Sequence, residues 1–441
     1  MIRIRILAIA TAAMLAIAGA TILWLNGQQR QQSGAIDEQP TRSIVFANWV
    51  STEDAARQMI NRVIEDFEKD HPGVAIVNMP IPFDYYEQEL TALSLSGKAP
   101  NVIQLSGNNT AVLVALGVLE PLEAYALRGD YLLDQFNDTI VDAGKYGDKL
   151  YAVPFALTPH GFWYNKSLMK QAGLDPNRPP RTIEELNRHL RIVKEKLPDA
   201  YGIGIDTTMA NYAFFSNFPF FQAFGAGDIL ANLPDPKFDT PEMRQTLGWL
   251  QEITREGYTP VNKQFRVQRE LMAHGKIVYR VDGPYFSGIA KSYNSNLTDE
   301  LFDETFGVTV IPSMDGERHY TATDIHNLGM STQTPDKELA WEFIQYLTRG
   351  ESSIRNYIVP LGMIPAHPSS QEQFEHLLRR PYMRSYLREV IPSAQLMPFG
   401  PKMSQATQYI LTGIQEVVRG VSPGIISRAV NDALVKLYED D

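Results

Sequence analysis

The chain of 441 residues contains no cysteine. This absence excludes structural disulfides, metal sites built from thiolates and a cysteine nucleophile. It also excludes the lipid-modified cysteine that tethers many exported bacterial proteins, so a lipoprotein is not expected. Any attachment to a membrane must therefore come from the polypeptide itself.

Basic residues are outnumbered, with 40 Lys and Arg against 51 Asp and Glu, which gives a net charge of -11. Proteins that bind nucleic acid need clustered Lys and Arg to neutralise phosphates, so nucleic acid is not an expected partner. Enzyme motifs are also missing: there is no nucleophile elbow, HExxH motif, phosphate loop or histidine pair at metal-ligand spacing. The sequence predicts no catalytic residue, no metal site and no cofactor.

Long hydrophobic runs are rare as well, and the longest one, residues 6–25, follows Arg3 and Arg5 and carries no charge. A run of about 20 apolar residues can span a bilayer as a helix. With basic residues in front of it, such a run predicts a signal peptide or a signal anchor. Cleavage patterns occur at AIA (16–18) and AGA (18–20), but cutting there would leave the apolar residues 21–25 on the mature protein. Both alternatives stay open for residues 1–25, and in both the remaining chain is periplasmic or otherwise extracytoplasmic.

Residues 26–41 (NGQQRQQSGAIDEQPT) are rich in Gln and poor in large apolar side chains. This composition predicts a flexible polar linker. Roughly 400 residues follow it, enough for two sizeable lobes that each have a hydrophobic core.

The body opens with strands that alternate with helices. The pattern predicts strands at 43–46, 74–79 and 101–105, with helices that begin near 54 and near 84 between them. This alternation predicts an α/β fold with a mostly parallel sheet covered on both faces. Because ligands bind beyond the carboxyl ends of such strands, the loops at 48–51 and 106–110 should lie on one rim.

Eight segments along the body resemble a known family in their order and rough spacing. They are FEKDHPGVAI (67–76), ALGVLEPL (115–122), YAVPFALTPHGFWYNKSLM (151–169), PRTIEEL (180–186), AHGKIVYRVDGPYF (273–286), FGVTVIPSMDG (306–316), TPDKELAWEFIQYLT (334–348) and LMPFGPKMS (396–404). None is diagnostic alone, since residues 182–185 are only a capping box. Together they resemble the family 1 extracellular solute-binding proteins, in particular the maltodextrin-binding branch that serves ABC importers.

The resemblance implies a two-lobe periplasmic-binding-protein fold (type II) with a ligand cleft between the lobes. It places lobe one at 42–155 and 283–358, and lobe two at 156–282 and 359–441. Lobes that exchange segments in this way suit hinge closure on a ligand. The implied partners are a carbohydrate ligand and ABC permease subunits in the membrane, and we expect a monomer.

Sugars present hydroxyl edges and apolar CH faces, so a sugar cleft needs aromatic rings with polar side chains between them. Residues of these kinds on the predicted rim and crossing segments are the expected ligand-binding residues. They are Asn48, Trp49, Ser51, Asn108, Asn109, Thr158, His160, Phe218, Asp282, Gly283, Tyr285, Asp324 and His326.

Comparison with the maltodextrin-binding branch refines the expected ligand. Tyr285 matches a ring that stacks on sugar, whereas Thr158 stands where that branch has a sugar-contacting carboxylate. Asn108 and Asn109 replace a charged pair, and Thr407 stands in place of a stacking tryptophan. The cleft thus has fewer charges and one ring fewer, which favours a different, smaller saccharide.

Several of these residues also have a purely structural interpretation. Asn108 and Asn109 suit a tight loop, Asp282 begins a turn, and His160 and His326 suit buried polar roles. The aromatic segment 211–224 is either core or presents Phe218 or Phe221 to the cleft.

Other functions remain open at this point. A membrane-tethered sugar sensor would have the same sequence features. A glycoside-acting enzyme would need two carboxylates about 5 to 9 Å apart, for which Asp282 and Asp324 are the candidate pair. A polyamine or ferric-ion receptor is disfavoured, because Tyr85 and Tyr86 fall on a predicted helix and not on a cleft loop.

Overall fold

The computed structural model describes residues 41–439, apart from 129–130, 137, 228, 230–234, 399 and 401, and for Asn108, Thr139 and Asp324 it describes the backbone only. The predicted signal peptide or anchor, and all of the predicted linker except Thr41, lie outside the described residues. Within the described range no helix is both long enough and apolar enough to cross a membrane. The chain from Arg42 onward forms one compact unit.

Two large β-sheets organise the described part of this unit. The seven-stranded sheet has the order β12-β6-β11-β3-β1-β2, with β13 paired to β11, and the four-stranded sheet has the order β10-β7-β9-β8. The strands of the first sheet are β1 (Arg42–Asn48), β2 (Val74–Pro80), β3 (Val102–Leu105), β6 (Ala152–Pro159), β11 (Thr321–Met330), β12 (Ile364–Pro365) and β13 (Ala394–Leu396). Those of the second are β7 (Gly161–Asn165), β8 (Tyr201–Gly204), β9 (Ile277–Asp282) and β10 (Phe306–Thr309). A short hairpin joins β4 (Lys145–Tyr146) to β5 (Lys149–Leu150).

The strand directions differ in part from the prediction. β1 pairs in parallel with both β2 and β3, as the alternating pattern predicted. However, β11 runs antiparallel to β3 and β6, and β7 runs antiparallel to β9 and β10. The prediction of a mostly parallel sheet is therefore wrong, and both sheets are mixed. The reason is topological: β6 leads out of the first sheet and β11 leads back into it, so these neighbours must run in opposite directions.

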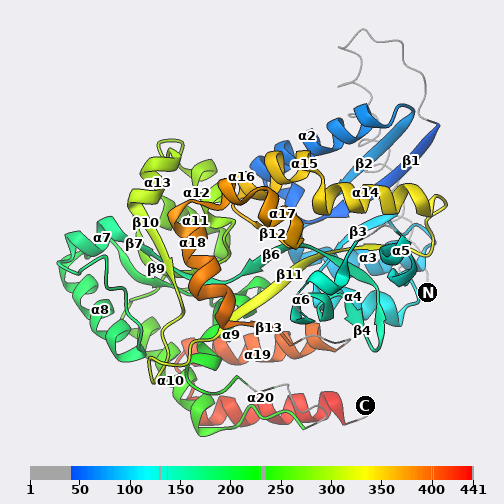
Figure 1. Cartoon of the computed structure of the whole chain (residues 1–441). Helices are drawn as coiled ribbons and strands as arrows, with labels where there is room; N and C mark the ends of the chain where they lie inside the picture. The colour runs from blue at the N-terminus through cyan, green and yellow to red at the C-terminus, as the bar shows by residue number, and fades with distance from the viewer. Residues whose placement is uncertain are drawn as a thin grey trace, which may run out of the picture. The chain divides into compact units, whose positions relative to one another are not determined.

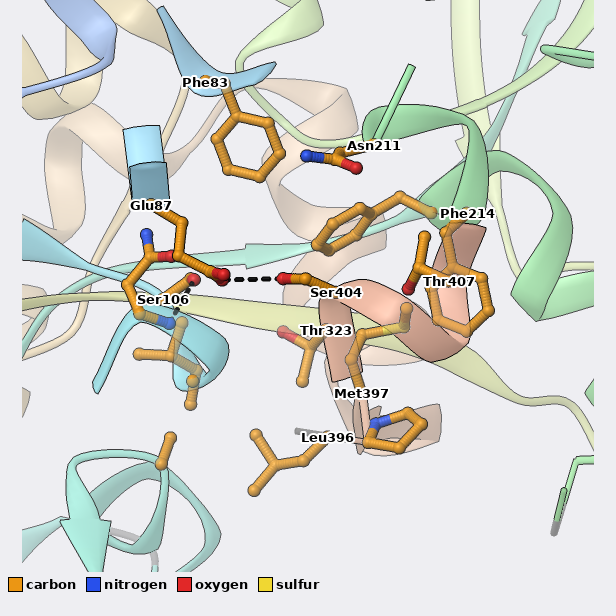
Figure 2. Close-up of a pocket in the computed structure, with 16 residues that line it drawn as sticks. Phe83, Glu87, Ser106, Asn211, Phe214, Thr323, Leu396, Met397, Ser404 and Thr407 are labelled. Atoms are coloured by element: carbon orange, nitrogen blue, oxygen red, sulfur yellow. Dashed lines mark hydrogen bonds between the residues drawn. The ribbon is translucent and has the colours of Figure 1, made fainter. Parts of the chain in front are cut away.

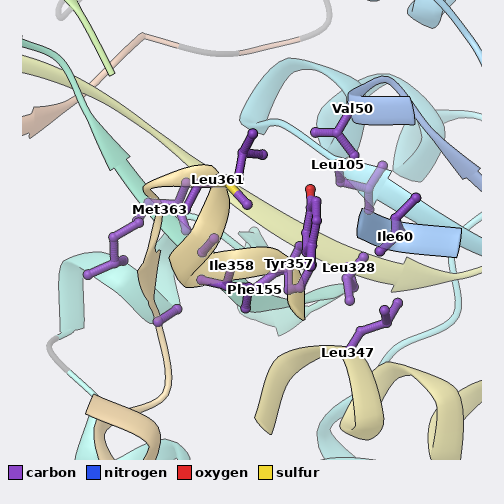
Figure 3. Close-up of a cluster of buried hydrophobic side chains, with 14 of the residues drawn as sticks. Val50, Ile60, Leu105, Phe155, Leu328, Leu347, Tyr357, Ile358, Leu361 and Met363 are labelled. Atoms are coloured by element: carbon purple, nitrogen blue, oxygen red, sulfur yellow. The ribbon is translucent and has the colours of Figure 1, made fainter. Parts of the chain in front are cut away.

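Helices pack against the two sheets, and their apolar side chains form two hydrophobic clusters together with those of the strands. The first cluster contains buried side chains of β1, β3, β6 and β11, with α2 and α14 among its helices; Figure 3 shows part of it around Phe155, Leu328 and Tyr357. The second contains side chains of β9 and of α8, α9, α10, α19 and α20.

The helices before β9 are α2 (Asp54–Asp70), α3 (Tyr86–Leu95), α4 (Gly107–Ala115), α5 (Glu123–Arg128), α6 (Asp138–Asp142), α7 (Lys166–Gln171), α8 (Ile183–Lys196), α9 (Tyr212–Ala223), α10 (Pro241–Arg255) and α11 (Phe265–Ala273). Those after it are α12 (Phe286–Tyr293), α13 (Asp299–Thr305), α14 (Lys337–Arg349), α15 (Glu351–Ser353), α16 (Val359–Leu361), α17 (Pro368–Gln373), α18 (Pro381–Ser385), α19 (Met403–Val418) and α20 (Pro423–Tyr438). Short 3-10 turns include η1 (Val50–Thr52), η2 (Phe83–Tyr85), η3 (Leu133–Gln135), η5 (Glu375–Leu378) and η7 (Ile391–Ser393), and η4 (Ile354–Ile358) and η6 (Tyr386–Val390) are π-helical.

The chain changes sheet first at His160, between β6 and β7 (Figure 1). It returns between β10 and β11, later than the predicted position near 283, because β10 still pairs with β7 in the four-stranded sheet. Likewise β12, which falls in the range predicted for lobe two, pairs with β6 in the seven-stranded sheet. A turn motif such as Asp282-Gly283-Pro284 marks the end of a strand but does not reveal which sheet the next strand joins.

Local sequence explains two helix starts, those of α8 and α4. The predicted capping box is present at α8, where Glu185 N donates to Thr182 Oγ1 and Thr182 N donates to the Glu185 carboxylate. Residues 107–110 form the first turn of α4 and not a loop, with Ser106 as N-cap. The loop interpretation of Asn108 and Asn109 is therefore wrong.

Candidate functional site

Two pockets lie beyond the carboxyl ends of β1 and β3. We call the first, of about 720 Å³ and partly open to solvent, the aromatic chamber. It is lined by Trp49, Val50, Thr52, Glu53, Ala56, Phe83, Thr158, His160, Tyr212, Phe215, Phe265, Arg266, Arg269, Tyr285, Ile289, His326, Leu361 and Met363.

The second pocket has a volume of about 770 Å³ and is also partly open to solvent. We call it the hydroxyl chamber, because four Ser and Thr side chains line it. Its lining is Phe83, Glu87, Ser106, Gly107, Asn109, Ala143, Asn211, Phe214, Phe215, Thr323, Ile325, Leu396, Met397, Pro398, Ser404 and Thr407 (Figure 2). Phe83 and Phe215 line both chambers, so the two chambers adjoin at these rings.

Trp49 follows β1 directly, so the strand end fixes its position. Its ring makes edge contacts with Phe83, Tyr86 and His326 at centroid distances of 5.5, 5.0 and 5.1 Å. Only 9% of the residue is exposed. Trp49 is therefore both part of the first hydrophobic cluster and part of the chamber wall.

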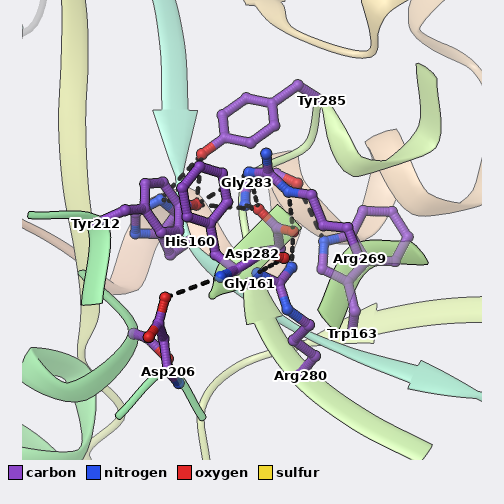
Figure 4. A network of polar contacts seen from close by, with 12 residues as sticks. His160, Gly161, Trp163, Asp206, Tyr212, Arg269, Arg280, Asp282, Gly283 and Tyr285 are labelled. Carbon is purple, nitrogen blue, oxygen red and sulfur yellow. Dashed lines mark hydrogen bonds and ion pairs between the residues drawn. The ribbon is translucent and has the colours of Figure 1, made fainter. Parts of the chain in front are cut away.

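A buried polar network lies behind the aromatic chamber (Figure 4). Asp282, at the end of β9, receives two hydrogen bonds of 2.8 Å from Arg269 of α11, and Arg280 also pairs with it. All three residues are at most 3% exposed. The Asp282 carboxylate is therefore fully engaged by two guanidinium groups, an arrangement that stabilises buried charge far better than a single contact would.

The directions of the hydrogen bonds in this network follow from the proton count of each hydroxyl. Tyr212 donates its only proton to Asp282 Oδ1 (3.1 Å), so it accepts from Arg269 Nη2 (3.2 Å) and from Tyr285 OH (2.9 Å). Since Tyr285 gives its proton to Tyr212, its 3.2 Å contact with His160 requires a proton on His160 Nε2. His160 Nδ1 is then an acceptor, and this buried atom has no hydrogen-bond partner among the described residues.

Both histidines of the aromatic chamber are neutral. Burial, together with the charges of Arg269 and Arg280, lowers the pKa of His160 to about 3. Burial lowers the pKa of His326 to about 3 as well. Gln104 Nε2 lies 3.2 Å from His326 Nδ1 and donates to it, which leaves the His326 proton on Nε2.

The charges at this chamber are balanced. Buried Arg269 and Arg280 face Asp282 and the buried Asp206, whose charge acts on Arg280. Burial and the neighbouring Arg269 lower the pKa of Arg280 to about 10, so it remains charged near neutral pH.

At the chamber wall, Arg266 pairs with Glu53 at 3.3 Å. The chamber thus offers no uncompensated charge from these groups and suits a neutral ligand.

Among the side chains that the structure describes, the hydroxyl chamber has one carboxylate in its wall. Glu87 of α3 accepts a 2.7 Å hydrogen bond from Ser404 of α19, drawn in Figure 2. Burial raises the pKa of the Glu87 carboxyl despite this bond. Most of the other polar groups here are hydroxyls and amides.

Of the predicted ligand-binding residues, Trp49, Thr158, His160, Tyr285 and His326 line the aromatic chamber, and Asn109 lines the hydroxyl chamber. The side chains of Asn108 and Asp324 lie outside the described residues.

The remaining predicted residues support the chambers without lining them. Asn48 is fully buried, and its side chain donates to Asn78 and accepts from Ser51 N. Phe218 is 2% exposed, packs in the second cluster and lines neither chamber. Asp282 lies behind the wall, and Gly283 adjoins Tyr285 so closely that an added Cβ would lie 2.4 Å from the ring.

Sequence reasoning missed residues that the tertiary structure brings to the aromatic chamber, among them Phe83, Tyr212, Phe215, Arg266 and Arg269. A signal existed for Arg269 alone. It occupies the apolar helix face shared by Phe265 and Met272, an unusual position for a cation without a buried partner.

Comparisons with known proteins agree with this architecture. The maltotriose-binding protein of Pyrococcus abyssi is 23% identical over 397 residues, which cover 89% of this chain and 80% of that protein. The sn-glycerol-3-phosphate-binding periplasmic protein of Salmonella typhimurium is 28% identical over 224 residues, 47% of this chain and 49% of that protein. A solved ABC transporter solute-binding protein from Thermotoga lettingae, bound with alpha-D-tagatose, has the same fold, with a TM-score of 0.79 at 21% identity over 91% of this chain and 100% of that one.

The two-lobe periplasmic-binding-protein fold is the architecture that the sequence segments implied. The model of the bacterial extracellular solute-binding proteins matches residues 49–352, more than half of the chain. This protein therefore belongs to the bacterial extracellular solute-binding protein family.

Proposed function

We propose that this protein is the saccharide receptor of an ABC importer and binds a neutral mono- or oligosaccharide by hinge closure. The observation that carries the proposal is the aromatic chamber, where rings of Trp49, Tyr212, Phe215, Phe265 and Tyr285 surround neutral polar groups. Aromatic faces pack against the CH faces of a sugar, and hydroxyl and imidazole groups match its hydroxyls. The maltotriose-binding relative and the tagatose-bound structure support the same ligand class.

In this proposal Tyr285 and Trp49 pack against one sugar ring, while Thr158 and His326 exchange hydrogen bonds with its hydroxyls. His326 supplies the Nε2 proton. A buried polar group without a partner costs about 1–3 kcal/mol, so these few groups would discriminate among epimers. Asn109, in the adjoining hydroxyl chamber, is a ligand contact only if the sugar reaches that chamber.

A phosphorylated ligand is the second candidate, because a relative binds sn-glycerol 3-phosphate. The charge balance argues against it. Arg269 and Arg280 are already paired with Asp282, and Arg266 is paired with Glu53. A phosphate would have to break one of these pairs, whereas a neutral sugar leaves them intact.

The same geometry argues for binding without catalysis. A glycoside-acting enzyme needs a carboxylic acid or carboxylate free to reach the glycosidic oxygen or anomeric carbon. Asp282, one of the two candidate carboxylates, is 1% exposed and has both oxygens engaged.

For the lobes, we propose that lobe one is built on the seven-stranded sheet and lobe two on the four-stranded sheet. The chain would cross at His160, between β10 and β11, and again after β12. Ligand would close the lobes, and the closed monomer would present a joint surface to membrane permease subunits.

We further propose that residues 6–25 remain as a membrane anchor or are cleaved as a signal peptide, both of which place the lobes outside the cytoplasm. Fractionation after osmotic shock distinguishes them. An anchored protein stays with the membranes in high salt, and a cleaved one is released with a new N-terminus near residue 19 or 21.

A thermal-shift screen of the purified protein against neutral mono- and oligosaccharides and against sn-glycerol 3-phosphate tests the proposal. A ligand at 100 times its Kd stabilises the folded state by about 2.7 kcal/mol, which gives a clear rise in Tm. We expect at least one neutral saccharide to stabilise the protein and to remain uncleaved in a reducing-end assay. Stabilisation by sn-glycerol 3-phosphate alone, or release of reducing ends, would overturn the proposal.

A further inference from the structure

The two chambers meet at a pair of rings, and one of these rings comes from a stiff segment. Phe83 opens η2, directly after the sequence Pro80-Ile81-Pro82. Each proline restricts its own φ angle and the conformation of the residue before it. The backbone that carries Phe83 therefore has little freedom to move the ring away.

Rings from both sides hold Phe83 in place. Its centroid lies 5.5 Å from Trp49, which follows β1, and 6.1 Å and 6.5 Å from Phe215 and Tyr212 of α9. All three contacts are edge-to-face, the preferred geometry of aromatic pairs. Figure 2 shows the Phe83 ring pointing into the hydroxyl chamber, and the same residue also lines the aromatic chamber.

Phe83 separates the two chambers, and polar contacts on both sides of it hold the segment that carries its ring. Asn211 Nδ2 lies 3.5 Å from the backbone oxygen of Asp84, the residue after Phe83. One helical turn beyond Phe83, Glu87 accepts the 2.7 Å hydrogen bond from Ser404. The segment that carries Phe83 is thus joined to α9 and to α19 on the opposite side of the cleft.

We infer that Phe83 limits ligand length, because its ring stops a saccharide chain in the aromatic chamber from extending into the hydroxyl chamber. The inference rests on the proposed saccharide-binding function. A chain that extends from the aromatic chamber toward the hydroxyl chamber would have to pass between Phe83 and Phe215, and so would displace the edge-to-face contacts and the flanking hydrogen bonds. With the Phe83 ring removed, the two chambers become one continuous cleft.

The test compares Phe83→Ala with the wild-type protein by titration calorimetry against malto-, manno- and cello-oligosaccharides of one to five units. We expect the wild type to bind one- or two-unit ligands at least tenfold more tightly than three- to five-unit ligands of the same series. Phe83→Ala should reduce this preference at least tenfold. Phe215→Ala removes the opposite ring and should shift the preference in the same direction, which keeps the test valid if Phe83→Ala does not fold.

Tyr85→Ala is the matched control, because Tyr85 lies in the same 3-10 turn but is 65% exposed and lines neither chamber. Its length preference should equal that of the wild type. Equal wild-type affinity for two- and four-unit ligands, or an unchanged preference in folded Phe83→Ala and Phe215→Ala, would overturn the inference and leave saccharide binding intact. Failure of every saccharide to bind the wild type would instead overturn the proposed function, and this inference with it.

Discussion

Tyr285 combines two roles that different substitutions can separate. Its ring lines the aromatic chamber, and its hydroxyl donates to Tyr212 while accepting from His160. Tyr285→Ala should lower saccharide affinity at least tenfold, about 1.4 kcal/mol, because it removes the packing surface. Tyr285→Phe keeps that surface and should lose less affinity. Titration calorimetry with the saccharide found in the screen measures both effects.

The control for this pair is Tyr293→Ala, at the last residue of α12, the helix whose N-cap is Tyr285, and outside both chambers. It should leave the affinity unchanged even if it lowers the Tm. Wild-type affinity in a folded Tyr285→Ala variant would show that the ring packs against the protein and not against the ligand.

At the scale of elements, β6 and β11 each place a histidine at the chamber. His160 follows the last residue of β6, and His326 lies at a register shift in β11, between it and Asn327. Irregularities of this kind often re-aim a side chain beside a functional site. The strand pair that connects the two sheets therefore also supplies the buried neutral imidazoles.

These buried histidines make the stability of the fold depend on pH. Both have a folded-state pKa of about 3, whereas an unfolded histidine titrates near 6.5. Below pH 6.5 both histidines bind protons in the unfolded chain but stay neutral in the folded chain, so the free energy of unfolding falls as the pH falls. The loss at pH 5 is about 2 kcal/mol for each histidine.

Urea unfolding at pH 7.5, 6 and 5 measures this dependence. His326→Gln should be less stable than the wild type at pH 7.5 but should lose less stability on acidification. His376→Gln, which removes an exposed histidine, should keep the wild-type slope. A wild-type slope in His326→Gln would contradict the assignment of His326 as a buried neutral group.

At the scale of the molecule, direct contacts join the two sides of the cleft at the wall of the aromatic chamber. Arg266 of α11 pairs with Glu53 at 3.3 Å and donates to Thr52 Oγ1 at 3.4 Å. The Arg266 and Glu53 side chains are 40% and 24% exposed, so the pair is worth at most about 1 kcal/mol. Such an energy is small for folding but sufficient to shift an equilibrium between open and closed lobes severalfold.

Glu53→Gln should therefore increase the open population of the unliganded protein and weaken saccharide binding about two- to threefold. The double variant Glu53→Arg with Arg266→Glu keeps an ion pair at this place, so it should restore the closed population and the affinity.

A spin-label distance across the lobes measures the open population. Because the chain has no cysteine, the labels can be attached at Leu95→Cys and Ile425→Cys, two exposed positions. Arg255→Gln breaks an exposed ion pair with Glu256, within one lobe, and should leave the distance unchanged. An unchanged distance in Glu53→Gln would exclude this pair as a determinant of closure.

Much of the fold could be predicted from the chain alone, because local physics decides it. The first three strands and the helices between them follow from apolar periodicity, and the start of α8 follows from the Thr182–Glu185 capping box. The ordered family segments predicted the two-lobe architecture. The end of the first strand also placed Trp49 on the cleft rim, and the crossing segment implied by the resemblance placed Thr158 and His160 there. The structure puts all three at the aromatic chamber, and their contact with ligand stays a prediction.

Only the tertiary structure decided which sheet each later strand joins and which rings face the cleft. Helix α9 is apolar on every side and almost wholly buried, so its sequence carries no period that distinguishes Phe215 in the chamber wall from Phe218 in the core. The role of Asp282 depends on Arg269, thirteen residues away on another element. The sequence by itself therefore determined the family and the local elements. Pairing between distant segments decided the charge balance and the partition of the cleft, because these are set by contacts that no local pattern encodes.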